Sequence, residues 1–299
     1  MKPRRGLTTI TVAELCGDNR PLIFFRARPA QNMSFLDPQL ILELALIGTC
    51  TGFLAGLLGI GGGMIMVPFL TIILTHKGYP AEYTVKMAVA TSLATIAFTS
   101  LSSVRAHNQR GAVLWPVVKV LAPGILVGSL LGAQVAHALP ARLLGVFFAV
   151  FVAFSATQML LNRKPQPSRT LPGPAATFGV GTLIGGLSAL VGAGGAFISV
   201  PFMAWCNVKI HDAVGTSAAL GFPIALAGTI GYVYAGIGLP QMPPGSIGYL
   251  YLPGLVVIAA ASMLMAPVGA RTAHRMDIQP LRRLFAVVLY GLAAYFLLR

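Results

Sequence analysis

Charged residues, and acidic ones above all, are scarce in this 299-residue chain. Only 9% of the residues are charged, and Asp and Glu together number 7. Soluble domains carry charge on about a quarter of their residues, so this chain cannot cover a folded surface with solvated side chains. Disorder is excluded too, because 56% of the residues are hydrophobic. Apolar stretches of about twenty residues recur, and each can cross about 30 Å of hydrocarbon. The sequence predicts an all-α polytopic membrane protein.

Cysteine and histidine are few and isolated. Cys16, Cys50 and Cys206 show no CxxC or His-paired spacing, which argues against a disulfide framework and a zinc site. The histidines stand singly, without an HExxH pair or paired carboxylates, so an intramembrane enzyme is disfavoured. No GxxxxGK[ST] loop for ATP occurs. We expect no catalytic residues, no metal and no cofactor.

Basic residues outnumber acidic ones and give a formal net charge of +14. They are scattered through short loops instead of clustering with aromatic residues, so we expect no nucleic-acid partner. Lys and Arg in loops orient membrane spans and attract the anionic cytoplasmic leaflet. The expected partner is therefore the lipid bilayer, and the sequence is also compatible with a homo-oligomer.

Composition divides the chain into four parts. Residues 1–38 form a basic tail without the apolar core of a secretory signal. Two interpretations stay open, a cytoplasmic tail or a natural start at Met33. Residues 39–162 form the first transmembrane repeat and residues 175–299 the second. The linker, 163–174, is rich in proline and charge and cannot continue a helix.

The two halves carry the same sequence pattern. GTCTGFLAGLLGIGGGMIMVPFL at 48–70 reappears as GTLIGGLSALVGAGGAFISVPFM at 181–203, with a constant offset of 133. The element GAQVAH at 132–137 reappears as GARTAH at 269–274. Agreement at Gly and Pro over such a length indicates a tandem duplication.

Hydropathy predicts five apolar segments in each half. They are 40–60, 64–76, 86–104, 113–136 and 142–161, then 175–192, 196–208, 213–236, 248–270 and 281–298. The second segment of each half would be a helix of about 20 Å, which is a half-span. Ten segments imply repeats of inverted topology, as in many secondary transporters. Eight segments, with each glycine-rich join counted as one broken span, imply parallel repeats. The charges in the loops do not distinguish these two topologies, and we favour ten segments.

Consecutive glycines interrupt each half just before its short helix. Inside a bilayer such a break is tolerated only where it is buried in protein or lines a wet cavity. The first N–H groups of the following helix carry partial positive charge, and glycine lets a ligand approach closely. Close helix packing explains Gly52 and Gly56 well but explains consecutive glycines poorly. We expect an anion site formed by Gly61, Gly62, Gly63, Met64, Gly194, Gly195 and Ala196.

Several polar side chains are candidates to complete this site. Thr91-Ser92 and its counterpart Thr216-Ser217 supply hydroxyl donors for an oxyanion, although each hydroxyl could instead bond its own helix backbone. Arg105, His107 and Arg271 follow the third and ninth segments and could bind an anion or anchor the spans at the interface. The only carboxylate in an apolar segment is Glu43, which disfavours a cation substrate.

The boxes GLLGIGGGMIMVPFL and ALVGAGGAFISVPFM, with the paired elements ATSL and GTSA, resemble those of the TauE/SafE sulfite exporter family, also called DUF81 or TSUP. The resemblance covers roughly 40–298. It implies a protein of the bacterial inner membrane with two related halves that moves small sulfur-containing anions such as sulfite, sulfoacetate or thiosulfate. The second box reads GAGGA where the first reads GIGGG, which leaves open whether both halves contact the substrate equally.

These observations predict a secondary transporter. Its substrate is expected to be a small oxyanion or organosulfonate such as sulfite or sulfoacetate, exported by alternating access between the two repeats. Two alternatives stay open, a passive anion channel and a transporter of another small carboxylate or oxyanion. A membrane scaffold is a further class, which transport assays would separate.

Overall fold

The computed structural model describes residues 38–58, 62–161, 172–240, 242–273 and 278–298. The N-terminal tail, Gly61 and most of the linker lie outside these described residues. The described part contains ten α-helices and one two-stranded hairpin. The helices are α1 (Pro38–Leu58), α2 (Gly63–His76), α3 (Ala81–Gln109), α4 (Trp115–Ala138), α5 (Ala141–Leu161), α6 (Pro174–Val191), α7 (Ala196–Trp205), α8 (Ile210–Gly236), α9 (Leu252–Ala273) and α10 (Ile278–Leu298). In the hairpin, β1 (Ser246–Ile247) pairs antiparallel with β2 (Leu250–Tyr251) directly before α9.

The structure confirms an all-α polytopic membrane protein. Seven of the described helices are long and apolar enough to cross a membrane: α1, α3, α4, α5, α6, α8 and α9. Each of the ten predicted segments has its helix, and α2 and α7 are short, with 14 and 10 residues. Many large apolar side chains on the long helices are exposed, for example Val256 and Leu264 on α9. Such faces suit contact with lipid tails.

Two helices begin at residues other than those that hydropathy predicted. The third segment was predicted to begin at residue 86, but α3 begins at Ala81, directly after Pro80. Proline fixes the backbone angle that a helix start requires, whereas hydropathy stops at Glu82 and Lys86. The ninth segment was predicted from residue 248, but its first residues form the hairpin, and α9 begins at Leu252.

Helices from different halves pack side by side in matching register. Gly48 and Gly52 of α1 contact Ile258 and Ser262 of α9, so these two helices run parallel. A methyl group on Gly52 would lie 2.5 Å from the backbone of Ser262, which leaves room only for glycine.

The helices α6 and α4 repeat this arrangement. Gly181 and Gly185 of α6 face the carbonyl oxygens of Leu121 and Ile125 of α4, again in parallel order. Each half therefore packs its first helix on the fourth helix of the other half.

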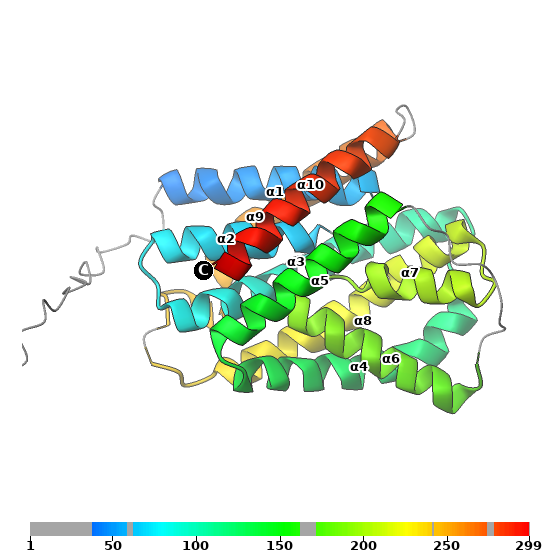
Figure 1. Cartoon of the computed structure of the whole chain (residues 1–299), viewed down its shortest axis with the longest axis horizontal. Helices are drawn as coiled ribbons and strands as arrows, with labels where there is room; N and C mark the ends of the chain where they lie inside the picture. The colour runs from blue at the N-terminus through cyan, green and yellow to red at the C-terminus, as the bar shows by residue number, and fades with distance from the viewer. Residues whose placement is uncertain (1–37, 59–61, 162–171, 241, 274–277, 299) are drawn as a thin grey trace, which may run out of the picture. The chain divides into compact units, whose positions relative to one another are not determined.

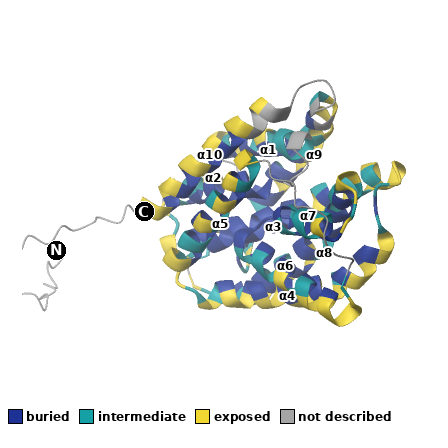
Figure 2. Cartoon of the chain, turned by 45° about the vertical axis from the view of Figure 1, so that its right-hand side comes forward, coloured by how far each residue is buried: buried dark blue, intermediate teal, exposed yellow. Residues whose placement is uncertain are grey.

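The first helices of the two halves, α1 and α6, run in opposite directions (Figure 1). Both α3 and α8 lie in the middle of the bundle, where buried residues dominate, whereas α5 and α10 carry more exposed residues (Figure 2). The antiparallel pair α3 and α8 meets where Gly228 packs on Leu93 and Gly221 on Ser100. The short helices α2 and α7 contact this central pair.

Candidate functional site

The first glycine break ends at Gly62, which precedes α2. Its φ is 65°, a left-handed conformation that glycine adopts without strain. The carbonyl of Gly62 accepts the N–H groups of Ile65 and Met66, at 3.2 and 3.3 Å. Within the described residues, the N–H groups of Gly63 and Met64 have no hydrogen-bond partner. The helix therefore begins with donors that are free in this part of the structure.

The second break spans Gly192 to Gly195, between α6 and α7, and is described throughout. Gly192 and Gly195 have φ values of 71° and 76°. A left-handed residue ends α6, and another precedes α7 at the end of this four-residue connection. All four residues of the break are buried.

Hydrogen bonding in the second break is uneven. The carbonyl of Gly195 accepts the N–H groups of Ile198 and Ser199, at 3.0 and 2.9 Å. None of the four consecutive N–H groups of residues 194–197 forms a hydrogen bond with a described residue. Buried backbone N–H groups are almost always paired with protein, water or ligand. This stretch therefore offers hydrogen-bond donors to water or to an anion.

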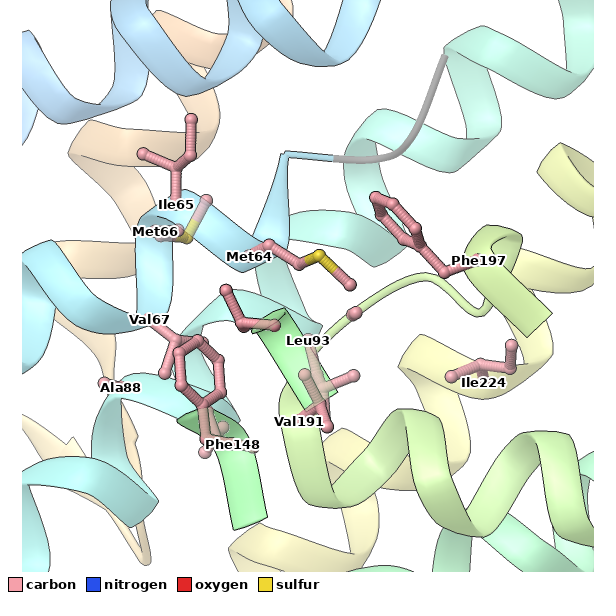
Figure 3. Close-up of a cluster of buried hydrophobic side chains, with 14 of the residues drawn as sticks. Met64, Ile65, Met66, Val67, Ala88, Leu93, Phe148, Val191, Phe197 and Ile224 are labelled. Carbon is pink, nitrogen blue, oxygen red and sulfur yellow. The ribbon is translucent and has the colours of Figure 1, made fainter. Parts of the chain in front are cut away.

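The two breaks touch each other in the middle of the protein. Gly63, the first residue of α2, lies directly against the carbonyl oxygen of Gly192. The side chains of Met64 and Phe197, from the first turns of α2 and α7, point toward one another (Figure 3). Both helix starts thus belong to one region.

The predicted serine donors hold carbonyl groups of the second break. The hydroxyl of Ser92 donates to the oxygen of Gly192 at 2.8 Å. Ser199 donates to the oxygen of Gly195 at 3.0 Å, and Ser217 lies 2.6 Å from the Ser199 hydroxyl. Because the proton of Ser199 goes to Gly195, the proton of Ser217 goes to Ser199. Both predicted serines therefore orient the break in this structure.

The predicted threonines contact the segments that precede α9 and α4. Thr91 accepts the backbone N–H of Tyr251 at 3.2 Å, and Thr216 accepts that of Leu114 at 3.0 Å. Both threonine side chains are fully buried. Neither hydroxyl proton has an acceptor among the described residues, so each can still be donated.

Comparison with known proteins now places the chain in a family. A profile of the family described as Sulfite exporter TauE/SafE matches residues 44–296. The chain belongs to this family. It is 34% identical over 254 residues to a probable membrane transporter protein of Haemophilus influenzae. The aligned region covers 85% of this chain and 96% of the relative.

More distant relatives carry the same description. The chain is 30% identical to the probable membrane transporter protein YdhB of Bacillus subtilis, over 66% of this chain and 79% of the relative. It is 28% identical to the probable membrane transporter protein MJ0441 of Methanocaldococcus jannaschii, over 64% of this chain and 72% of the relative. No solved structure gives a significant match. The family and these names indicate a multi-pass membrane transporter.

The basic residues expected at the site of this TauE/SafE protein lie elsewhere. Arg105 is exposed and His107 half-buried, and Arg105 follows Ser92 by 13 residues along α3. That spacing corresponds to about 20 Å along the helix. Arg271 is exposed in the last turn of α9. The structure thus gathers the glycines and serines but leaves these three residues near helix ends.

Sequence reasoning missed a buried lysine in α3. Lys86 is only 4% exposed and donates to the carbonyl oxygen of His137, at the end of α4, at 2.7 Å. The Tyr249 ring lies 5.8 Å from the ammonium, and the Tyr249 hydroxyl lies 3.0 Å from Nδ1 of His137. Burial raises the pKa of Tyr249 to about 12, so this phenol stays neutral. A helix start predicted at Pro80 would have placed Lys86 inside the span.

The second missed residue is Ser188, in the last turn of α6. Its hydroxyl is buried and has no hydrogen-bond partner in the described structure. The sequence signal was available, because Ser188 is one of the positions at which the two glycine-rich boxes differ in polarity. The corresponding residue in the first half is Ala55.

Proposed function

We propose that this protein is a secondary transporter that exports a small sulfur-containing oxyanion or organosulfonate, such as sulfite or sulfoacetate. The observation that carries the proposal is the meeting of the two breaks, where Gly63 at the start of α2 lies against the carbonyl oxygen of Gly192 and the side chains of Met64 and Phe197, from the first turns of α2 and α7, point toward one another (Figure 3). In the second break, N–H groups that lack a partner in the described structure add to this arrangement.

The chemistry of this region favours an anion. Helix N-termini carry about half a positive elementary charge and expose N–H donors. Residues 62–64 and 192–197 include no carboxylate, and their glycines allow close approach of a ligand to the backbone. Low dielectric strengthens such an interaction relative to water.

Alternating access is the mechanism that we propose. The two halves begin with helices of opposite direction, and each packs its first helix on the fourth helix of the other (Figure 1). The backbone contacts of Thr91 and Thr216 are equivalent as well, since Leu114 and Tyr251 are separated by 137 residues, as are the GAQVAH and GARTAH elements. These paired contacts support two inverted repeats that rock against each other around the breaks.

The driving force would come from the proton-motive force or from the membrane potential. Outward movement of an anion through the inner membrane is favoured by about 2.3 kcal/mol per charge per 100 mV. Passive anion flux and carrier transport use the same force, so kinetics must distinguish them.

Transport by purified protein in lipid vesicles tests the proposal. We expect saturable uptake of labelled sulfite or sulfoacetate, and accelerated uptake when the vesicles are preloaded with the unlabelled anion. Flux that rises linearly with concentration and shows no counterflow would identify a passive channel. Saturable flux of carboxylates alone would change the substrate class, and no flux of any small anion would contradict transport.

A further inference from the structure

Ser188 points at the start of α7. A methyl group built on Gly195 would lie 3.1 Å from the Ser188 hydroxyl oxygen. Ser188 is 1% exposed, and its hydroxyl lacks a partner in the described structure. Serine in a helix commonly bonds a carbonyl one turn earlier, but this hydroxyl does not. A buried donor is thus directed at a helix N-terminus whose own donors are unpaired there.

The first break lacks this hydroxyl. By the offset of 133, Gly62 corresponds to Gly195 and Ala55 to Ser188. The geometry is equivalent, since a methyl group on Gly62 would lie 3.2 Å from the Ala55 methyl carbon. At matching positions, one break presents an oxygen and the other presents a hydrocarbon.

We propose that the second break is the polar subsite for the transported anion and that Ser188 is a ligand. Its hydroxyl would donate to one anion oxygen, while N–H groups of residues 194–197 bind another. On the other side, the start of α2 at Gly63 and Met64 would supply only backbone donors and an apolar wall. This inference rests on the proposed function. It adds that the two breaks contribute different chemical groups to the site.

The surroundings of the second break fit this role. Ser92 holds the oxygen of Gly192, and Ser199 holds that of Gly195, so the carbonyl groups are turned toward protein donors. The N–H of Ala193, in the same peptide as the Gly192 carbonyl, donates to the oxygen of Ser188. The N–H of Ala196, in the same peptide as the Gly195 carbonyl, has no partner among the described residues. Gly194 is less crowded than its neighbours, because the nearest atom to a methyl group placed there is 3.6 Å away.

The test replaces Ser188 by alanine. An unpaired buried hydroxyl destabilises a protein, and alanine favours helix, so Ser188→Ala should fold and should unfold at a higher temperature without ligand. A hydrogen bond to a charged group is strong, so the Kd for sulfite should rise about tenfold or more. Higher stability combined with weaker binding would not arise from a structural role.

Ser129→Ala is the matched control. Ser129 is also buried with an unpartnered hydroxyl, but it faces Gly185 in the seam between α4 and α6. This variant should gain similar stability and keep the wild-type Kd for sulfite. Binding is measured by sulfite titration of purified protein, and transport by counterflow in vesicles.

The outcomes separate the two proposals. Wild-type binding with unchanged affinity in Ser188→Ala would overturn the subsite but leave the transporter intact. An equal loss in Ser129→Ala would also overturn it, because the effect would not be specific to the break. Wild-type protein that neither binds nor transports sulfite, sulfoacetate or thiosulfate would contradict the proposed function and the subsite with it.

Discussion

At the scale of single residues, the site depends on glycines that differ in role although they are neighbours. Gly195 has a left-handed φ of 76° and starts α7. Gly194 has no such conformation, and a methyl group placed there would lie 3.6 Å from Ile96, which is an ordinary van der Waals contact. The sequence predicted that both belong to the site, but it could not show that one needs a left-handed backbone and that the other has room for a methyl group. That distinction depends on φ and on atoms from other helices.

Alanine at these two positions should therefore have different effects. Gly195→Ala forces a side chain into the left-handed region at a cost of about 1–2 kcal/mol, and its methyl group would lie 2.5 Å from Ile224. We expect a lower unfolding temperature. Gly194→Ala should unfold like wild type but bind sulfite more weakly, because its methyl group occupies space beside the free donors. Thermal unfolding with and without sulfite measures both effects, and wild-type affinity in Gly194→Ala would contradict this assignment of space.

At the scale of elements, hydropathy predicted the number of helices well. It predicted poorly the residues at which some helices begin. The break residues and the short helices followed from consecutive glycines, which no unbroken span would carry. Lys86 was assigned to the edge of a span because charge lowers hydropathy, yet in the structure it caps α4 through the carbonyl of His137. Hydropathy is a local property of the sequence, so it cannot indicate a contact between residues that are 51 positions apart.

Replacement of Lys86 by methionine tests this cap. Lys86→Met keeps an unbranched side chain, one atom shorter, but removes the donor to the last turn of α4, and loss of a partner for a buried polar group costs about 1–3 kcal/mol. We expect a lower unfolding temperature in detergent. Lys119→Met is the control, because Lys119 is exposed on α4, and it should unfold like wild type. Equal stability of both variants would show that the Lys86 contact adds nothing to stability.

At the scale of the whole molecule, each half completes the other. The predicted duplication concerned sequence alone and did not indicate that α1 packs on α9 and α6 on α4. The threonines Thr91 and Thr216 were predicted as donors to a ligand; in the structure each accepts a backbone N–H from the opposite half, which the sequence did not indicate. Such contacts depend on how the halves assemble. The alternating access that we propose would move these two interlocked halves against each other.

The central claim is that an anion binds where the two breaks meet. Selenite is a close analogue of sulfite, and its selenium atom can be located by anomalous scattering. In crystals of the protein soaked with selenite, we expect an anomalous peak within hydrogen-bonding distance of the N–H groups of residues 194–197 and of the Ser188 hydroxyl. A peak confined to helix ends near Arg105 or Arg271, or no peak at the breaks at saturating selenite, would contradict the account.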